Sequence, residues 1–176
     1  MISRAFPPWF SWLLESKLRL GVLAPETLVA RLPLGPDFVV AEIGSGTSVY
    51  ARAVRSHVRM LIGLELQWEL IVKARHRDSR LHQVQGSALS LPFRPSSFDV
   101  IYLVTVLGEL THQSDALGEM HAALRPGGFV SISEHLPDPD FVSRARLRRA
   151  CEQAGFGFLR SIGPWWNFTS TFQKPH

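Results

Sequence analysis

The feature that most constrains the fold is a glycine-containing turn at residues 44–47, which follows a run of apolar and β-branched residues at 38–43. The run predicts a buried strand, and residues 47–55 have the pattern of a helix. Gly44 and Gly46 allow a tight turn and a close approach of the backbone to a ligand. Parallel α/β sheets bind nucleotides at such strand-to-helix turns. Taken alone, the turn is equally consistent with a plain connection between two elements.

A second acidic strand end favours the nucleoside interpretation. Residues 60–65 form another apolar run, and it ends in Glu65. A carboxylate at about twenty residues after the glycine turn is placed to accept hydrogen bonds from the two ribose hydroxyls. The alternative is a surface glutamate that caps the helix beginning near Leu66. Val49 stands where a dinucleotide fingerprint has a third glycine or alanine, and no Lys-Ser/Thr pair follows the turn. The turn therefore predicts a nucleoside site without a phosphate chain.

Length and composition predict a single globular domain in a reducing compartment. The chain has 176 residues, of which 45% are hydrophobic and 19% charged, enough for one domain with a core. Cys151 is the only cysteine, which excludes a disulfide framework and a cysteine-rich zinc site and fits the cytoplasm. The net charge of +4 is spread along the chain without interleaved aromatic residues, so we expect no nucleic-acid partner.

The amino-terminal part, residues 1–35, predicts a helical cover over the main domain at 36–176. Pro7 and Pro8 precede a first helix that carries several aromatic residues, and a second short helix is expected at 25–32. Two interpretations stay open for the aromatic residues. They pack onto the sheet, or residues 6–20 form a lid over the ligand site or a peripheral contact with a membrane surface. The segment is too short and too charged to span a bilayer.

From residue 38 onward, strands alternate with helices, which predicts a parallel sheet between helical layers. After the first strand and helix, we expect strands at 60–65, 81–85, 98–104 and 129–133, and helices at 67–77, 113–124 and 140–154. The segments 156–162 and 168–172 predict a final antiparallel pair. Arg125-Pro126-Gly127-Gly128 is expected to end the helix at 113–124, because proline cannot continue it and the glycines release the chain.

Five motifs in order resemble one family. They are Glu42-Ile43-Gly44-Ser45-Gly46-Thr47, Gly63-Leu64-Glu65, Gly86-Ser87-Ala88 with Leu91-Pro92-Phe93, Ser97-Phe98-Asp99, and Leu124-Arg125-Pro126-Gly127-Gly128. Together they resemble the class I S-adenosylmethionine-dependent methyltransferases, in particular the small-molecule branch that includes the ubiquinone and menaquinone biosynthesis enzymes. The resemblance covers about residues 36–173. It implies an α/β fold: a single doubly wound, Rossmann-like sheet of seven strands, the last antiparallel, with helices on both faces.

The resemblance also implies a cofactor, S-adenosyl-L-methionine, and the residues that would hold it. These are Glu42, Gly44, Ser45, Gly46 and Thr47 for the methionine part, Glu65 for the ribose, Leu66, Ser87 and Ala88 for the adenine, and the backbone around Leu103 and Val104 for the amino group. Three positions depart from the family pattern. Ser48 replaces a frequent third glycine, which predicts a stiffer loop. Ser87 replaces an aspartate, which predicts an affinity lower by about an order of magnitude. Gly108 and Glu109 stand where many relatives have histidine.

Methyl transfer from a sulfonium needs alignment of donor and acceptor more than it needs catalytic side chains. A general base matters only for a protonated acceptor, and the candidates after the fourth and fifth strands are Glu109, His112, Glu134 and His135. No pattern of metal ligands is present. The prediction is a cytoplasmic methyltransferase, monomer or homodimer, acting on a small acceptor, with a hydrophobic acceptor as one option. The alternatives are a catalytically degenerate, cofactor-binding partner subunit and a nucleotide-linked oxidoreductase.

Overall fold

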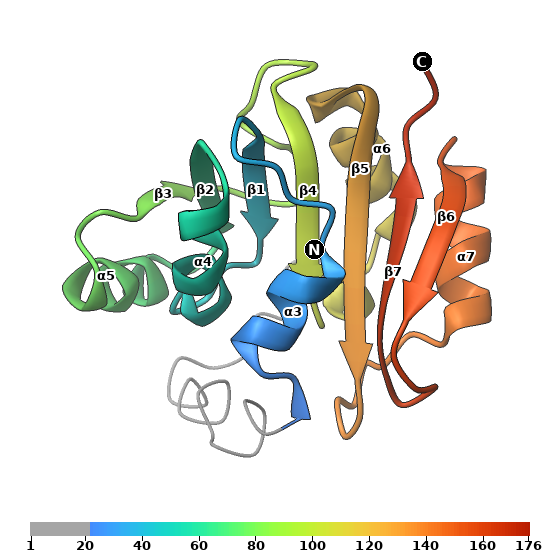
Figure 1. Ribbon diagram of the computed structural model, residues 1–176, viewed down its shortest axis with the longest axis horizontal. Coiled ribbons are helices and arrows are strands. Elements are labelled where there is room, and N and C mark those ends of the chain that lie inside the picture. Colours follow the sequence, from blue (N-terminus) through green and yellow to red (C-terminus); the bar gives the residue numbers. More distant parts are fainter. Residues whose placement is uncertain (1–21) are drawn as a thin grey trace.

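Seven strands form one sheet in the order β3-β2-β1-β4-β5-β7-β6 (Figure 1). The computed structural model describes residues 22–176. The strands are β1 (Val39–Ile43), β2 (Met60–Glu65), β3 (His82–Gln85), β4 (Phe98–Val104), β5 (Leu124–His135), β6 (Gly157–Ile162) and β7 (Asn167–Gln173). β1 to β5 pair in parallel, whereas β7 is antiparallel to both β5 and β6. The predicted fold class and the antiparallel last strand are confirmed.

Helices cover both faces of this sheet (Figure 1). They are α3 (Pro25–Arg31), α4 (Val49–Val54), α5 (Trp68–Arg77), α6 (Gln113–Ala123) and α7 (Arg144–Gln153), with short 3-10 helices η2 (Arg55–His57) and η3 (Leu107–Glu109). One apolar cluster joins α3 and α4 to the sheet, and it includes Leu28, Val54 and Tyr102. A second cluster joins α6 and α7 to the opposite face, and it includes Leu117, Leu147 and Ile132. The two layers hold the carboxyl ends of the parallel strands at one edge.

β5 is much longer than the strand expected at 129–133, because tertiary pairing extends it at both ends. Leu124 pairs with Phe98 of β4, so the strand begins directly after α6. Gly127 donates its amide to the carbonyl of Lys174, and the amide of Lys174 donates to Gly128. The proline-glycine segment that was expected to release the chain from the helix therefore lies inside the strand. The Lys174 ammonium donates to the carbonyls of His121 and Leu124, at 2.7 and 2.8 Å. Lys174, rather than the proline-glycine segment, therefore caps the end of α6.

The other boundaries differ by a few residues. α4 begins at Val49 rather than 47, and α7 begins at Arg144 rather than 140. The short helix expected at 25–32 is present as α3, but the helix expected near residues 6–20 lies outside the described residues. Within residues 22–176, no helix combines the length and the apolar character needed to cross a bilayer.

Candidate cofactor site

The loop between β1 and α4 lies across the carboxyl ends of the strands and has a backbone that favours glycine. Gly44 has a φ of 69° and Gly46 a φ of 53°. A Cβ atom on Gly44 would lie 2.5 Å from a methyl carbon of Val106, so no side chain fits there. The amides of Gly44 and Ser45 both donate to the carbonyl of Leu64 on β2, at 2.8 and 3.0 Å. The turn is therefore fixed between the end of β2 and the segment after β4.

Ser48, which replaces a frequent glycine of the family pattern, has a backbone conformation that favours glycine. Its φ is 62°, a left-handed conformation that costs a non-glycine residue about 1–2 kcal/mol. Its buried hydroxyl accepts a hydrogen bond from the Gln83 amide at 2.8 Å. The amide oxygen of Gln83 accepts in turn from the Ser45 hydroxyl at 2.9 Å. Gln83 on β3 thus braces both serines of the loop, a link that the sequence analysis missed because it joins distant segments.

Glu65 already holds the glycine loop from the end of β2. One carboxylate oxygen accepts the amide of Gly46 at 2.8 Å, and the other accepts the amide of Gln67 at 2.9 Å. The residue is 7% exposed. Each carboxylate oxygen has a further lone pair. Glu65 can therefore fix the loop and still accept hydrogen bonds from a vicinal diol such as a ribose.

Glu42 is a buried carboxyl group at the end of β1, 3% exposed. Its Oε2 atom makes no hydrogen bond to any residue in the part of the chain that the structure describes. Burial raises the pKa of Glu42 to about 8, an effect that the Tyr102 side chain partly offsets and the negative Glu65 reinforces. A buried carboxyl group with one oxygen left unpaired is suited to a cationic ligand group, since a neighbouring positive charge would lower its pKa again.

A pocket lies between these groups, and ten of the eleven positions predicted for the cofactor line it. They are Glu42, Gly44, Ser45, Gly46, Thr47, Glu65, Leu66, Ser87, Ala88 and Val104. The Ser87 hydroxyl accepts the amide of Leu89 at 3.1 Å, so its oxygen is engaged within its own turn. Leu103 is the exception, since its side chain is fully buried in the core and does not line the pocket.

The segment after β4 supplies lining residues that the sequence analysis missed. Thr105 and Val106 border the pocket directly after Val104, the last residue of β4 and a predicted cofactor position. Thr105 has a φ of 53°, and its amide donates to the carbonyl of Ser133 at 2.9 Å. A β-branched residue in this conformation is an outlier, and such strain gathers at functional sites. The sequence signal that could have identified Thr105 is its position directly after the fourth predicted strand.

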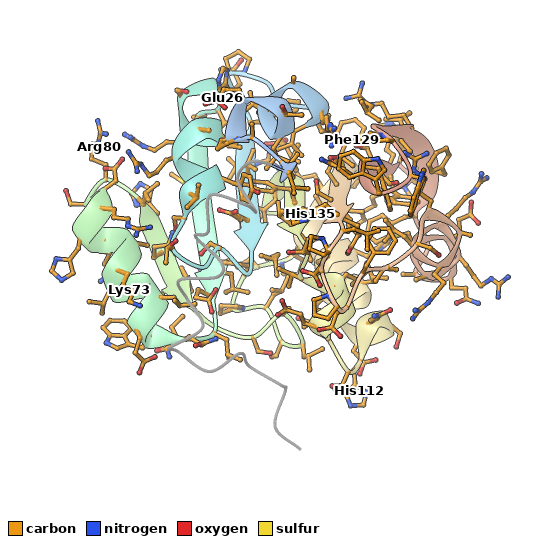
Figure 2. All side chains as sticks on the ribbon, turned by 90° about the horizontal axis from the view of Figure 1, so that it is seen from below. Glu26, Lys73, Arg80, His112, Phe129 and His135 are labelled. Carbon is orange, nitrogen blue, oxygen red and sulfur yellow. The ribbon has the colours of Figure 1, made fainter. Side chains whose placement is uncertain are left out.

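Among the four base candidates, the structure brings Glu109 to the pocket, where it belongs to the lining. His112 precedes α6 and is exposed at the periphery (Figure 2). His135 is buried at the end of β5 opposite Asn167, and it does not line the pocket. Glu134, on the same strand, accepts the amide of Val142 at 3.3 Å. Within residues 22–176, no group of three or more His, Cys, Asp or Glu side chains is placed to hold a metal ion.

Gly108 has a structural reason to differ from the family pattern. A Cβ atom there would lie 1.8 Å from the carbonyl oxygen of Asp140, in the connection between β5 and α7. This connection therefore packs directly against η3. A histidine at position 108 would displace it, so the short connection and the glycine depend on each other.

Residues 41–132 match the methyltransferase-domain family. The chain is 32% identical over 128 residues to the ubiquinone/menaquinone biosynthesis C-methyltransferase UbiE of Dinoroseobacter shibae, covering 68% of this chain and 49% of that protein. It is 28% identical over 108 residues to a malonyl-[acyl-carrier protein] O-methyltransferase of Pectobacterium atrosepticum, covering 61% and 43% of the two chains. The chain spans about half the length of these curated relatives. An S-adenosylmethionine-dependent methyltransferase of Aquifex aeolicus has the same fold, with a TM-score of 0.83, 17% identity, and coverage of 96% of this chain and 99% of that one.

Sheet order, glycine loop and strand-end carboxylates together define a class I methyltransferase fold with a nucleoside-type pocket. The chain belongs to the methyltransferase-domain family.

Proposed function

We propose that this chain transfers a methyl group from S-adenosylmethionine to a small, apolar acceptor in the cytoplasm. The observation that carries the proposal is the pocket with two buried carboxyl groups, Glu42 and Glu65, on either side of the glycine loop. One group lacks a hydrogen-bond partner within residues 22–176 for its Oε2 atom, and the other has acceptor capacity left. An ammonium group and a ribose diol meet these two needs at once.

The residues present therefore fit the cofactor, and they divide its recognition between them. Glu42 would hold the methionine ammonium as a carboxylate, with the charge of the ligand offsetting the cost of its burial. Glu65 would accept from the ribose hydroxyls, while Leu66 and Ala88 would flank the adenine. When bound, S-adenosylmethionine supplies a methyl group on a positively charged sulfur, so that the leaving group is already activated.

We assign the acceptor to lining residues that the cofactor does not use. Among these are the apolar Val106, Leu110 and Leu89, together with Glu109. These apolar side chains exclude water and suit an apolar acceptor, which is held at reacting distance by packing. Glu109 is positioned to take the proton of a hydroxyl acceptor, and it is the base we retain from the four candidates. An acceptor without such a proton would make Glu109 dispensable.

One relative supports an apolar acceptor, and the other widens the range to a polar acyl group. One is a C-methyltransferase of quinone biosynthesis and the other an O-methyltransferase of a malonylated carrier protein. Both names describe acceptors other than nucleic acids. We therefore place quinol-like phenols and short acyl carboxylates first among the acceptors to be tested.

Thermal unfolding with S-adenosylhomocysteine, with NAD and ATP as controls, tests the cofactor. A ligand at about a hundred times its dissociation constant adds roughly 2.7 kcal/mol, which corresponds to about 5–10 °C for a domain of this size. Glu65→Gln should weaken binding about tenfold, because a neutral acceptor replaces a charged one. Glu69→Gln, on the exposed side of α5, is the matched control. No shift with S-adenosylhomocysteine in the wild type would refute the proposal.

Turnover is measured separately, by transfer of labelled methyl from S-adenosylmethionine to the acceptor panel. Methyl transfer that falls in Glu109→Gln only with hydroxyl acceptors would support its role as a base. Binding without turnover on any acceptor would instead favour a cofactor-binding partner subunit. Two further parts of the proposal need their own measurements: a membrane contact through residues 6–20, which lie outside the described residues, and the choice between monomer and homodimer.

A further inference from the structure

The outer edge of the sheet exposes large apolar side chains over a short stretch. Five of the eight large hydrophobic residues exposed within residues 22–176 lie on β6 and the turn that follows it. They are Phe158, Leu159, Ile162, Trp165 and Trp166, and Trp165 is 69% exposed. β6 is an edge strand that pairs only with β7. Residues 158–166 are called the hairpin surface below.

Arginines surround this surface. Arg144 of α7 donates to the carbonyls of Gly163 and Pro164 in the turn, the latter at 3.0 Å. The Arg148 guanidinium lies 4.7 Å from the ring centroid of Phe158. Exposed Arg146 and Arg149 complete the set on α7, whereas the Arg160 guanidinium on β6 donates to the carbonyl of Arg31 at 3.4 Å. Glu152 is the one acidic residue between positions 144 and 166, and it is paired with Arg148 at 2.7 Å. The apolar edge thus has a positive border along α7.

The charge decides between the partners that could cover this edge. A second copy paired edge to edge would bring the two sets of arginines together, and like charges oppose such pairing. An anionic lipid surface meets both features, since its phosphates attract arginine while tryptophan rings prefer the level of the headgroups. Arginine stems can lie along apolar surface while the guanidinium reaches the phosphates.

The turn of the hairpin surface lies at the edge of the sheet that carries the glycine loop. β7 is antiparallel to β5 and to β6, so β6 runs in the same direction as β1 and β4. The turn at 163–166 therefore projects from the same edge of the sheet as the glycine loop (Figure 1). A bilayer at this turn would lie on the side where the pocket opens.

We propose that the hairpin surface and the arginines of α7 dock the protein on an anionic lipid bilayer. Trp165 and Trp166 insert at the headgroup level, and Arg146 and Arg149 contact the lipid phosphates. The docking does not depend on methyl transfer. If the proposed function also holds, it brings the pocket to the surface from which an apolar acceptor would be delivered.

Flotation with vesicles of phosphatidylglycerol and phosphatidylcholine, compared with phosphatidylcholine alone, tests the proposal on the full chain. We expect binding to the anionic vesicles that weakens with salt. Trp165→Ala/Trp166→Ala and Arg146→Glu/Arg149→Glu should each weaken it about tenfold or more. The matched controls are Trp68→Ala, an exposed tryptophan of α5, and Arg59→Glu/Arg94→Glu, which changes the net charge equally. Both should bind as the wild type does.

Several outcomes would overturn the docking. Vesicle binding that survives both the tryptophan variant and the arginine variant would assign the contact to another segment, such as residues 6–20. Equal losses of vesicle binding in the arginine variant and in its control would mean that net charge alone attracts the protein to the vesicles. Absence of vesicle binding, together with a dimer in sedimentation that Trp165→Ala/Trp166→Ala disrupts, would assign the surface to a second copy. The thermal shift with S-adenosylhomocysteine should stay unchanged in every variant, so that a failure of docking and a failure of the proposed function are told apart.

Discussion

Replacing Glu42 with glutamine should stabilise the ligand-free protein, and the gain should grow with pH. Burial raises the pKa of Glu42 from 4.5 to about 8. Because the folded pKa is raised, the folded state binds the proton more tightly than the unfolded state. The resulting stability is complete below pH 4.5 and is lost as the pH rises through 8. Glutamine keeps the shape of the side chain and removes the titration.

The size of the effect follows from the width of that window. Each pH unit between the two pKa values changes the free energy of unfolding by about 1.4 kcal/mol. Between about pH 5 and pH 8 the wild type should therefore lose roughly 3–4 kcal/mol that Glu42→Gln does not lose. For a chain of this size the difference amounts to about 10 °C in melting temperature. The same substitution should weaken binding of S-adenosylhomocysteine, since it removes the carboxylate proposed for the ammonium group.

Urea unfolding at a series of pH values, for wild type and Glu42→Gln side by side, measures the difference directly. Asp78→Asn is the control with the opposite sign. The salt bridge with Arg80 lowers the pKa of Asp78 to about 2, so its contribution is lost only as the pH falls toward 2. Above pH 5 the offset between Asp78→Asn and wild type should be constant. A constant offset for Glu42→Gln as well would refute the assignment of a buried, protonated Glu42.

Three further predictions concern the same site. Binding of S-adenosylhomocysteine near pH 7 should release protons from Glu42, seen as a dependence of the calorimetric enthalpy on the buffer; a dependence that persists in Glu42→Gln would contradict this. Gly108→Ala should lower the melting temperature by several degrees, because overlap with Asp140 costs about 1–3 kcal/mol. Gly118→Ala, in open space on α6, should raise the melting temperature slightly. Equal effects of the two substitutions in a melting curve would refute the overlap. Ser87→Asp should tighten cofactor binding about tenfold in a titration, because a charged acceptor replaces a hydroxyl, and unchanged affinity would mean that position 87 does not meet the adenine.

Local patterns were enough to predict the fold because β1, β2 and β4, at the centre of the parallel part, are apolar runs with their own boundaries. The span of β4 agrees with the prediction to the residue, and the antiparallel pair β6 and β7 was expected from sequence. β5 was predicted too short because its ends are set by partners far along the chain, such as Lys174. Proline and glycine at 126–128 are local signals for the end of a helix, but tertiary pairing places them inside a strand.

The cofactor residues could be found for a related reason, while the residues that support them could not. Glu42 and Glu65 end apolar strands, so their position at the carboxyl edge follows from the sequence pattern. The link from Gln83 to Ser48 and the contact of Gly108 with Asp140 join segments that become neighbours only in the folded chain. His112 also follows a strand end, but strand position does not set the direction of a side chain beyond the strand.

The site combines strain that the fold absorbs with a buried, neutral carboxyl group that a cationic ligand would ionise. Ser48 and Thr105 hold left-handed conformations on two sides of the pocket, fixed by Gln83 and by the carbonyl of Ser133. Glu65 keeps the glycine loop in place through the Gly46 amide, so the loop need not be ordered at the moment of binding. A preformed loop lowers the cost of binding, and Glu42 supplies a favourable term that appears only when a cation is present. Stability of the free protein and affinity for the cofactor should therefore move in opposite directions at this residue, which is the trade-off expected where a carboxyl group is kept for function rather than for the fold.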